Sequence, residues 1–210
     1  MRDDLLRNPW DRPPFPKRGN SERVLFEAIG RALMQWEEVE GAFAHLFSTF
    51  RTGWPFDTTA NKEYGEPLNF VHRVQALKDA ACRYFQGHCS QELEGEFAEI
   101  VELALNWSQR RNDVAHGRAR QIHWIINPES RETLLTAQQP LRWCVIPPHF
   151  KADKFTEDER PTYVLTSREM NRFAAAFWNL SVRANKFMHR VEAPSDASFR
   201  RFVPPPLSSS

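Results

Sequence analysis

Residues 21–53 read SERVLFEAIGRALMQWEEVEGAFAHLFSTFRTG. Ser21 is a favoured helix N-cap, and Gly53, Trp54 and Pro55 follow as a stop signal. Between them, apolar side chains recur at the three- and four-residue spacing of one face of an α-helix. These side chains are Leu25, Ile29, Ala32, Trp36, Val39, Phe43, Phe47 and Phe50. The stretch therefore predicts one long amphipathic helix.

Three later segments show the same spacing, at about residues 68–87, 90–117 and 166–191. A polar loop that ends near Pro67 separates the first two predicted helices. The last segment opens with TSRE, a pattern typical of a capping box. These segments predict four main helices.

The region at about residues 118–165 has a different pattern. Three short β-prone runs, at 122–126, 141–146 and 162–165, are bounded by prolines. We expect two or three short strands there, in a small sheet or hairpin against one end of the helices. The expected fold is mainly α: an antiparallel four-helix bundle with a small β insert between the third and fourth helices.

Length and composition favour one globular domain. The chain has 210 residues, of which 41% are hydrophobic and 26% charged, enough for a single core over residues 21–192. Residues 1–20, rich in proline and arginine, and residues 193–210, with a proline and serine run, are expected to be a flexible arm and tail.

Charge and cysteine usage limit the classes of function. The formal net charge is +1, so any contact with RNA must be local, because proteins that grip long nucleic acid through phosphates are usually more basic. No run approaches the roughly 18 apolar residues of a membrane span, and the first residues do not form a secretory signal. Three cysteines without a Cys-x-x-Cys pair indicate reduced thiols in the cytoplasm, with no metal site and no cofactor.

The candidate site is Arg111-Asn112-Asp113-Val114-Ala115-His116-Gly117. Arg111 follows Leu93 by 18 residues, which returns it to the middle of the apolar stripe, so it needs a carboxylate, a phosphate or an open groove. Glu40 could turn inward to meet it. His116 lies about 140° from Arg111, near the edge of the stripe, and Asn112 could orient its ring. Gly117 then lets the chain turn away.

Two simpler interpretations need no ligand. The third predicted helix carries acidic residues early and basic residues late, as the helix dipole favours. The spacing of an arginine and a histidine five residues later also occurs at Arg83 and Arg118. His45, between two phenylalanines, is expected to be structural. Arg111 and His116 differ from the other pairs in context: Asn after the arginine, Gly after the histidine, and the end of a long helix.

That context resembles the HEPN superfamily of helical-bundle proteins. Its common pattern is an Arg, a polar residue that is often Asn, a few residues, and a His that closes a core helix; Arg111-Asn112 and Ala115-His116-Gly117 match it. The likeness extends more loosely over residues 21–190.

The resemblance implies a metal-independent endoribonuclease in a toxin or defence setting, with RNA as substrate and an antitoxin or other protein as partner. Arg111 would bind the scissile phosphate, His116 would be the general acid or base, and Asn112 would support them. The resemblance also implies a homodimer with two copies of the motif facing one cleft.

The sequence also departs from the family. HEPN toxins paired with a nucleotidyltransferase antitoxin carry a Tyr two places after the His, where this chain has Arg118. Control by adenylylation is therefore not expected. Two alternatives stay open: a non-catalytic helical dimer that binds a protein partner or small ligand, with Arg111 in a structural role, and a regulatory protein whose cleft binds a nucleotide.

Overall fold

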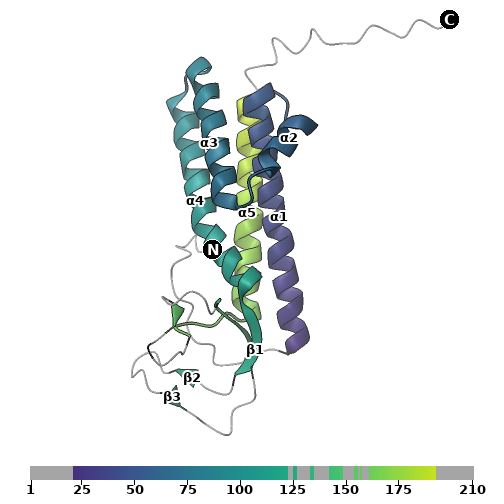
Figure 1. The fold of residues 1–210 in the computed structure, drawn as a ribbon, viewed down its shortest axis with the longest axis vertical. Helices are drawn as coiled ribbons and strands as arrows, with labels where there is room; N and C mark the ends of the chain where they lie inside the picture. The colour runs from purple at the N-terminus through teal and green to yellow at the C-terminus, as the bar shows by residue number, and fades with distance from the viewer. Residues whose placement is uncertain are drawn as a thin grey trace, which may run out of the picture. The chain divides into compact units, whose positions relative to one another are not determined.

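The computed structural model describes residues 21–122, 125–126, 133–134, 142–148, 154–155, 157 and 161–192. The expected arm and tail, residues 1–20 and 193–210, lie outside this part of the chain. The described elements are, in order, α1 Glu22–Thr52, α2 Thr58–Gly65, α3 Phe70–Gly87, α4 Gln91–His116, β1 Arg118–Ile122, β2 Ile125–Ile126, β3 Thr133–Leu134, β4 Arg142–Ile146 and α5 Ser167–Glu192 (Figure 1). The protein is mainly helical with a small β region between α4 and α5, as expected.

Side-chain caps explain where the helices begin. The backbone N–H of His72 donates to Asn69 Oδ1 at 3.0 Å at the start of α3, and that of Leu93 donates to Ser90 Oγ at 3.3 Å at the start of α4. Before α5, the Thr166 backbone N–H donates to Glu169 Oε2 at 2.9 Å. This bond confirms the capping box predicted from TSRE.

The polar loop expected before Pro67 was wrong, because it contains α2. Asp57 caps this helix by accepting a hydrogen bond from the Ala60 N–H at 2.8 Å, and the side chains of Ala60 and Tyr64 are buried. With only two buried side chains over eight residues, α2 has too short an apolar pattern to stand out in the sequence.

The chain forms two compact units, and each of the three long helices contributes to both. One unit contains the described residues up to Glu40 together with those of 102–181. Within it, the ring of Trp36 meets that of Phe177 edge to face, with 5.1 Å between centroids, and Trp107 lies 5.9 Å from Phe173. An aromatic core thus joins α1, α4 and α5 in this unit. The single domain expected over residues 21–192 stays a prediction.

The other unit contains residues 41–101 and the described residues from 182 onward. Phe50 lies in its core, with ring centroids 5.4 Å from Phe97, 5.7 Å from Phe85 and 6.5 Å from Phe187. These contacts join α1, α3, α4 and α5 in this unit.

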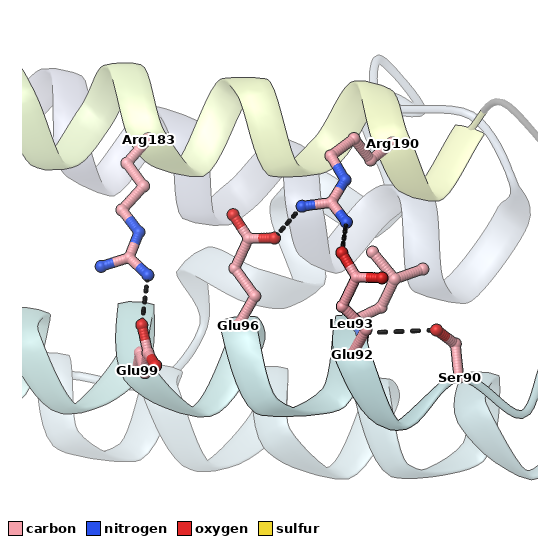
Figure 2. A network of polar contacts seen from close by, with 7 residues as sticks. All are labelled: Ser90, Glu92, Leu93, Glu96, Glu99, Arg183 and Arg190. Atoms are coloured by element: carbon pink, nitrogen blue, oxygen red, sulfur yellow. Dashed lines mark hydrogen bonds and ion pairs between the residues drawn. The ribbon is translucent and has the colours of Figure 1, made fainter.

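Contacts along the helices give their directions in this second unit. Figure 2 shows α4 and α5 side by side, with Arg183 paired to Glu99 and Arg190 to Glu92, so these two helices run antiparallel as expected. The α1–α3 pair differs. Phe43 meets Phe70 at the start of α3, and Phe50 meets Phe85 near its end, so α1 and α3 run in the same direction. The connection that contains α2 leads the chain from the end of α1 back to the start of α3.

The β region begins directly after α4. β1 pairs antiparallel with β4, from Arg118 opposite Ile146 to Ile122 opposite Arg142, and β2 pairs with β3 in a second two-stranded sheet. Leu165 extends the first sheet, because its backbone N–H and C=O both bond to Val145, at 2.9 and 2.7 Å. The expected short strands are present, but β1 starts at Arg118, earlier than the β-prone run at 122–126 predicted.

Candidate functional site

The last two turns of α4 carry the candidate motif and divide it into buried and exposed residues. Arg110 is 6% exposed and Asp113 0%, whereas Arg111 is half-buried and Asn112 and His116 are exposed. Arg111 was expected in the middle of the apolar stripe, beside a carboxylate, a phosphate or an open groove; it is half-buried, and the arginine buried beside a carboxylate is Arg110. The reason is that the side of α4 that carries Arg110 and Asp113 is contacted by the side chains of Lys154 and Tyr163, which the helical pattern does not show.

Those contacts form a buried polar group that we call the Asp113 cluster: Arg110, Asp113, Lys154 and Tyr163. Asp113 Oδ2 accepts hydrogen bonds from Arg110 Nη1 at 3.0 Å and from the Tyr163 hydroxyl at 2.7 Å, and Asp113 Oδ1 accepts one from Lys154 Nζ. The Arg110 guanidinium also lies over the Tyr163 ring, 5.2 Å from its centroid. The fully buried carboxylate is thus satisfied by three donors, two of them cationic.

The cluster controls the chemistry of its own members. Burial and the adjacent negative charge of Asp113 raise the pKa of Tyr163 well above its usual range, so this phenol stays a hydrogen-bond donor at neutral pH. Because the polar groups of Arg110, Lys154 and Tyr163 all donate to Asp113, we interpret the cluster as structural. It fastens Lys154 and Tyr163, which precede α5 in the chain, to the end of α4.

Gly117 is the second structural part of the motif. A Cβ at this position would lie 2.4 Å from the Asp113 carbonyl oxygen, 2.4 Å from Val145 Cγ1 and 2.8 Å from the Ile146 carbonyl oxygen. The Gly117 N–H also donates to the Asp113 carbonyl at 3.0 Å. The absence of a side chain lets β4 pack directly against the end of α4, which holds the last helical turn in place.

The three residues proposed for the site lie outside the Asp113 cluster: Arg111 is half-buried, and Asn112 and His116 are exposed. Arg111 Nη1 donates to Asn112 Oδ1 at 3.1 Å, so the amide orients the guanidinium. His116 is the final residue of α4. Asn112 and His116 are four residues apart and share one helix face. A cation, an amide and an imidazole are thus at least partly accessible to solvent in the last turns of α4. Arg111 and His116 lie about 140° apart round the helix, with Asn112 between them.

Two further residues singled out by the sequence, Glu40 and His45, lie in α1. Glu40 is 7% exposed and does turn inward, where its Oε1 accepts a hydrogen bond from Trp36 Nε1 at 3.2 Å. Its expected meeting with Arg111 stays a prediction. His45 is half-buried and meets Phe56 edge to face at 4.9 Å; burial lowers its pKa. These contacts support the structural role expected for His45.

Asp113 is the residue that sequence reasoning missed. Its spacing of three from Arg110 was a signal for a helical ion pair. Its other partners, Lys154 and Tyr163, are 41 and 50 residues away in the chain, so only the fold brings them together.

Within the described residues, no group of three or more His, Cys, Asp or Glu side chains could hold a metal ion. The three cysteines are free; burial raises the pKa of Cys144 to about 12. Among the described helices, none is long and apolar enough to cross a membrane. Comparison of the chain with models of protein families, with curated proteins and with solved structures gives no significant match.

Proposed function

We propose that this protein is a HEPN-like, metal-independent endoribonuclease that acts as a toxin or in defence. The observation that carries the proposal is the division of the motif in α4. Packing accounts for Arg110, Asp113 and Gly117, whereas Asn112 and His116 are exposed and Arg111 is half-buried. Arg111, Asn112 and His116, none of which belongs to the buried cluster, are the residues to which the HEPN resemblance assigns the site.

The proposed reaction uses the neighbouring 2′-hydroxyl of RNA as nucleophile. His116 takes the proton of this hydroxyl. The 2′-oxygen then attacks the phosphorus, and the bond between the phosphorus and the 5′-oxygen breaks. The leaving oxygen receives a proton from water or from the His116 of a second copy, which leaves a 2′,3′-cyclic phosphate and a 5′-hydroxyl. Arg111 stabilises the negative charge that develops on the phosphate, and Asn112 holds the Arg111 guanidinium.

The proposal includes further parts from the sequence: a cytoplasmic setting, no cofactor, a four-helix HEPN-like arrangement, a homodimer and a protein partner such as an antitoxin. The net charge of +1 is compatible with a local RNA contact at the end of α4.

The test is cleavage of RNA by the purified protein in the presence of EDTA. We expect products with a 2′,3′-cyclic phosphate and no cleavage of DNA, which lacks the 2′-hydroxyl. His116→Ala should lower the rate by about a hundredfold or more, because a general acid or base is lost. Its melting temperature should stay close to that of the wild type, since His116 is exposed.

The matched control is His189→Ala, which removes another exposed histidine from the last turns of a long helix, α5. It should leave the cleavage rate unchanged. Equal loss of rate in the two variants would defeat the assignment of His116, and a wild-type protein that does not cleave RNA would defeat the enzyme.

A second candidate is a non-catalytic helical module that binds a protein, a nucleotide or a small ligand. It is favoured by the Asp113 cluster, which gives two charged residues of the motif, Arg110 and Asp113, a structural role. Expression in cells separates the two candidates. An enzyme should inhibit growth, and His116→Ala should remove the inhibition. A binding module should either not inhibit growth or inhibit it equally with and without His116→Ala.

A further inference from the structure

A groove of about 470 Å³ lies between α3 and α4. Its floor is apolar and formed by Ala81 and Phe85 from α3 with Phe97 and Val101 from α4, all buried. The rings of Phe85 and Phe97 lie 6.4 Å apart. On the wall formed by α4, the exposed residue Ala98 has a small side chain and leaves space that a larger side chain would fill.

The two ends of the groove carry opposite charges. Only residues 88–90 connect α3 to α4, so the two helices run in opposite directions, and Gln86 and Glu94 share the end near the connection. Lys78 lies at the other end, two turns or about 12 Å back along α3. Neither Lys78 nor Glu94 forms an ion pair with another described residue.

Cys82 marks the midpoint of the groove. It lies four residues after Lys78 and four before Gln86, lines the groove and is exposed. A two-fold axis that passes this midpoint at right angles to α3 and α4 would bring the acidic end of one chain onto the basic end of another, with the two copies of Cys82 adjacent. Such self-complementarity is what an interface between identical chains across a two-fold axis requires.

We propose that the α3–α4 groove is a contact surface for a second copy of this chain. In the complex, Lys78 pairs with the partner's Glu94, Glu94 pairs with the partner's Lys78, and the exposed side chains of Cys82 and Ala98 between them are covered. The opposite charges on either side of Cys82 favour a second copy over a small apolar ligand, which would use the floor and leave both charges unpaired. The contact uses no residue of the Arg111–His116 motif, so it is a different interface from the motif-to-motif contact of the proposed enzyme and stands independently of RNA cleavage.

Charge reversal tests the pairing by sedimentation equilibrium. Lys78→Glu and Glu94→Lys should each weaken the dimer by about tenfold or more, because each creates two like-charge contacts across the two-fold axis. The double variant, Lys78→Glu with Glu94→Lys, should restore the wild-type dissociation constant, since the charges are only exchanged. Lys186→Glu, an exposed lysine of α5, is the matched control and should have no effect.

Cross-linking tests the position of the axis. In a Cys89→Ser chain, Cys82 is the one exposed cysteine of the described residues, and Cys144 is buried. A short bismaleimide should join two chains through Cys82. A chain that carries Ala115→Cys with Cys82→Ser and Cys89→Ser reports a motif-to-motif contact instead.

Three results would overturn the proposal. They are a wild-type protein that stays monomeric at high micromolar concentration, a charge exchange that fails to restore association, and a dimer that cross-links through Ala115→Cys but not through Cys82. If the protein is a monomer and added decanoate protects Cys82 from an alkylating reagent, the groove binds a small apolar molecule instead.

Discussion

The two ends of α4 use the same kinds of charged side chain in opposite surroundings. Near its C-terminal end, the carboxylate of Asp113 is 1% exposed and takes its partners from Arg110 and Lys154. Near its N-terminal end, Glu92 and Glu99 pair with arginines of α5 and are 81% and 68% exposed (Figure 2). Water already solvates the second set, so its pairs contribute little, whereas the buried carboxylate depends entirely on its partners.

The largest effect is expected from Asp113→Ala. The change leaves Arg110 and Lys154 without their carboxylate and removes the acceptor of the Tyr163 hydroxyl, so the free energy of unfolding should fall by about 3–5 kcal/mol. Urea denaturation followed by circular dichroism measures this.

Asp79→Ala is the matched control for that change, because Asp79 is an exposed aspartate within α3 that accepts one hydrogen bond from Gln75. It should alter the free energy of unfolding by about 0.5 kcal/mol or less. If Asp113→Ala costs no more than Asp79→Ala, the Asp113 cluster does not fasten the segment before α5 to α4.

The two glycines at opposite ends of α4 should respond to alanine with opposite signs. At Gly117 the new methyl group meets two backbone oxygens and Val145, so Gly117→Ala should destabilise the protein by about 1–3 kcal/mol. Gly95 lies inside the helix with no atom within 4 Å of an added Cβ, so Gly95→Ala should stabilise by about 0.5–1 kcal/mol. Thermal unfolding of both variants measures the difference, and a change of the same sign in both would contradict the packing at Gly117.

The same contrast explains how far the sequence could predict this molecule. Apolar stripes predicted α1, α3, α4 and α5, since helical periodicity is a local signal. The same periodicity placed the Arg111–His116 motif at the end of a helix, which α4 confirms. The burial of Arg110 and not Arg111 could not be predicted from nearby residues, because it depends on the contacts that Lys154 and Tyr163 make with Asp113.

The direction of α3 could not be predicted either. It follows from α2, whose eight residues bury only two side chains and give no clear stripe. Short connecting elements and contacts between distant residues were therefore the parts of the fold that the pattern did not contain.

The smallest effect is expected at the exposed end of α4. Arg190 bonds to both Glu92 and Glu96, and its side chain is 45% exposed. Arg190→Ala should lower the free energy of unfolding by about 1 kcal/mol or less, because exposed ion pairs are solvated and lose side-chain entropy when they form. The deficit should shrink further in about 1 M NaCl, where the Debye length is about 3 Å.

Salt is the control that separates the two ends of the helix. The loss caused by Asp113→Ala should persist in high salt, because ions do not reach a carboxylate that is fully buried. Urea denaturation of both variants at low and high salt gives the comparison. The contrary result is that Arg190→Ala lowers the free energy of unfolding as much as Asp113→Ala does, with as little dependence on salt. That result would contradict the idea that burial determines how strongly an ion pair stabilises α4.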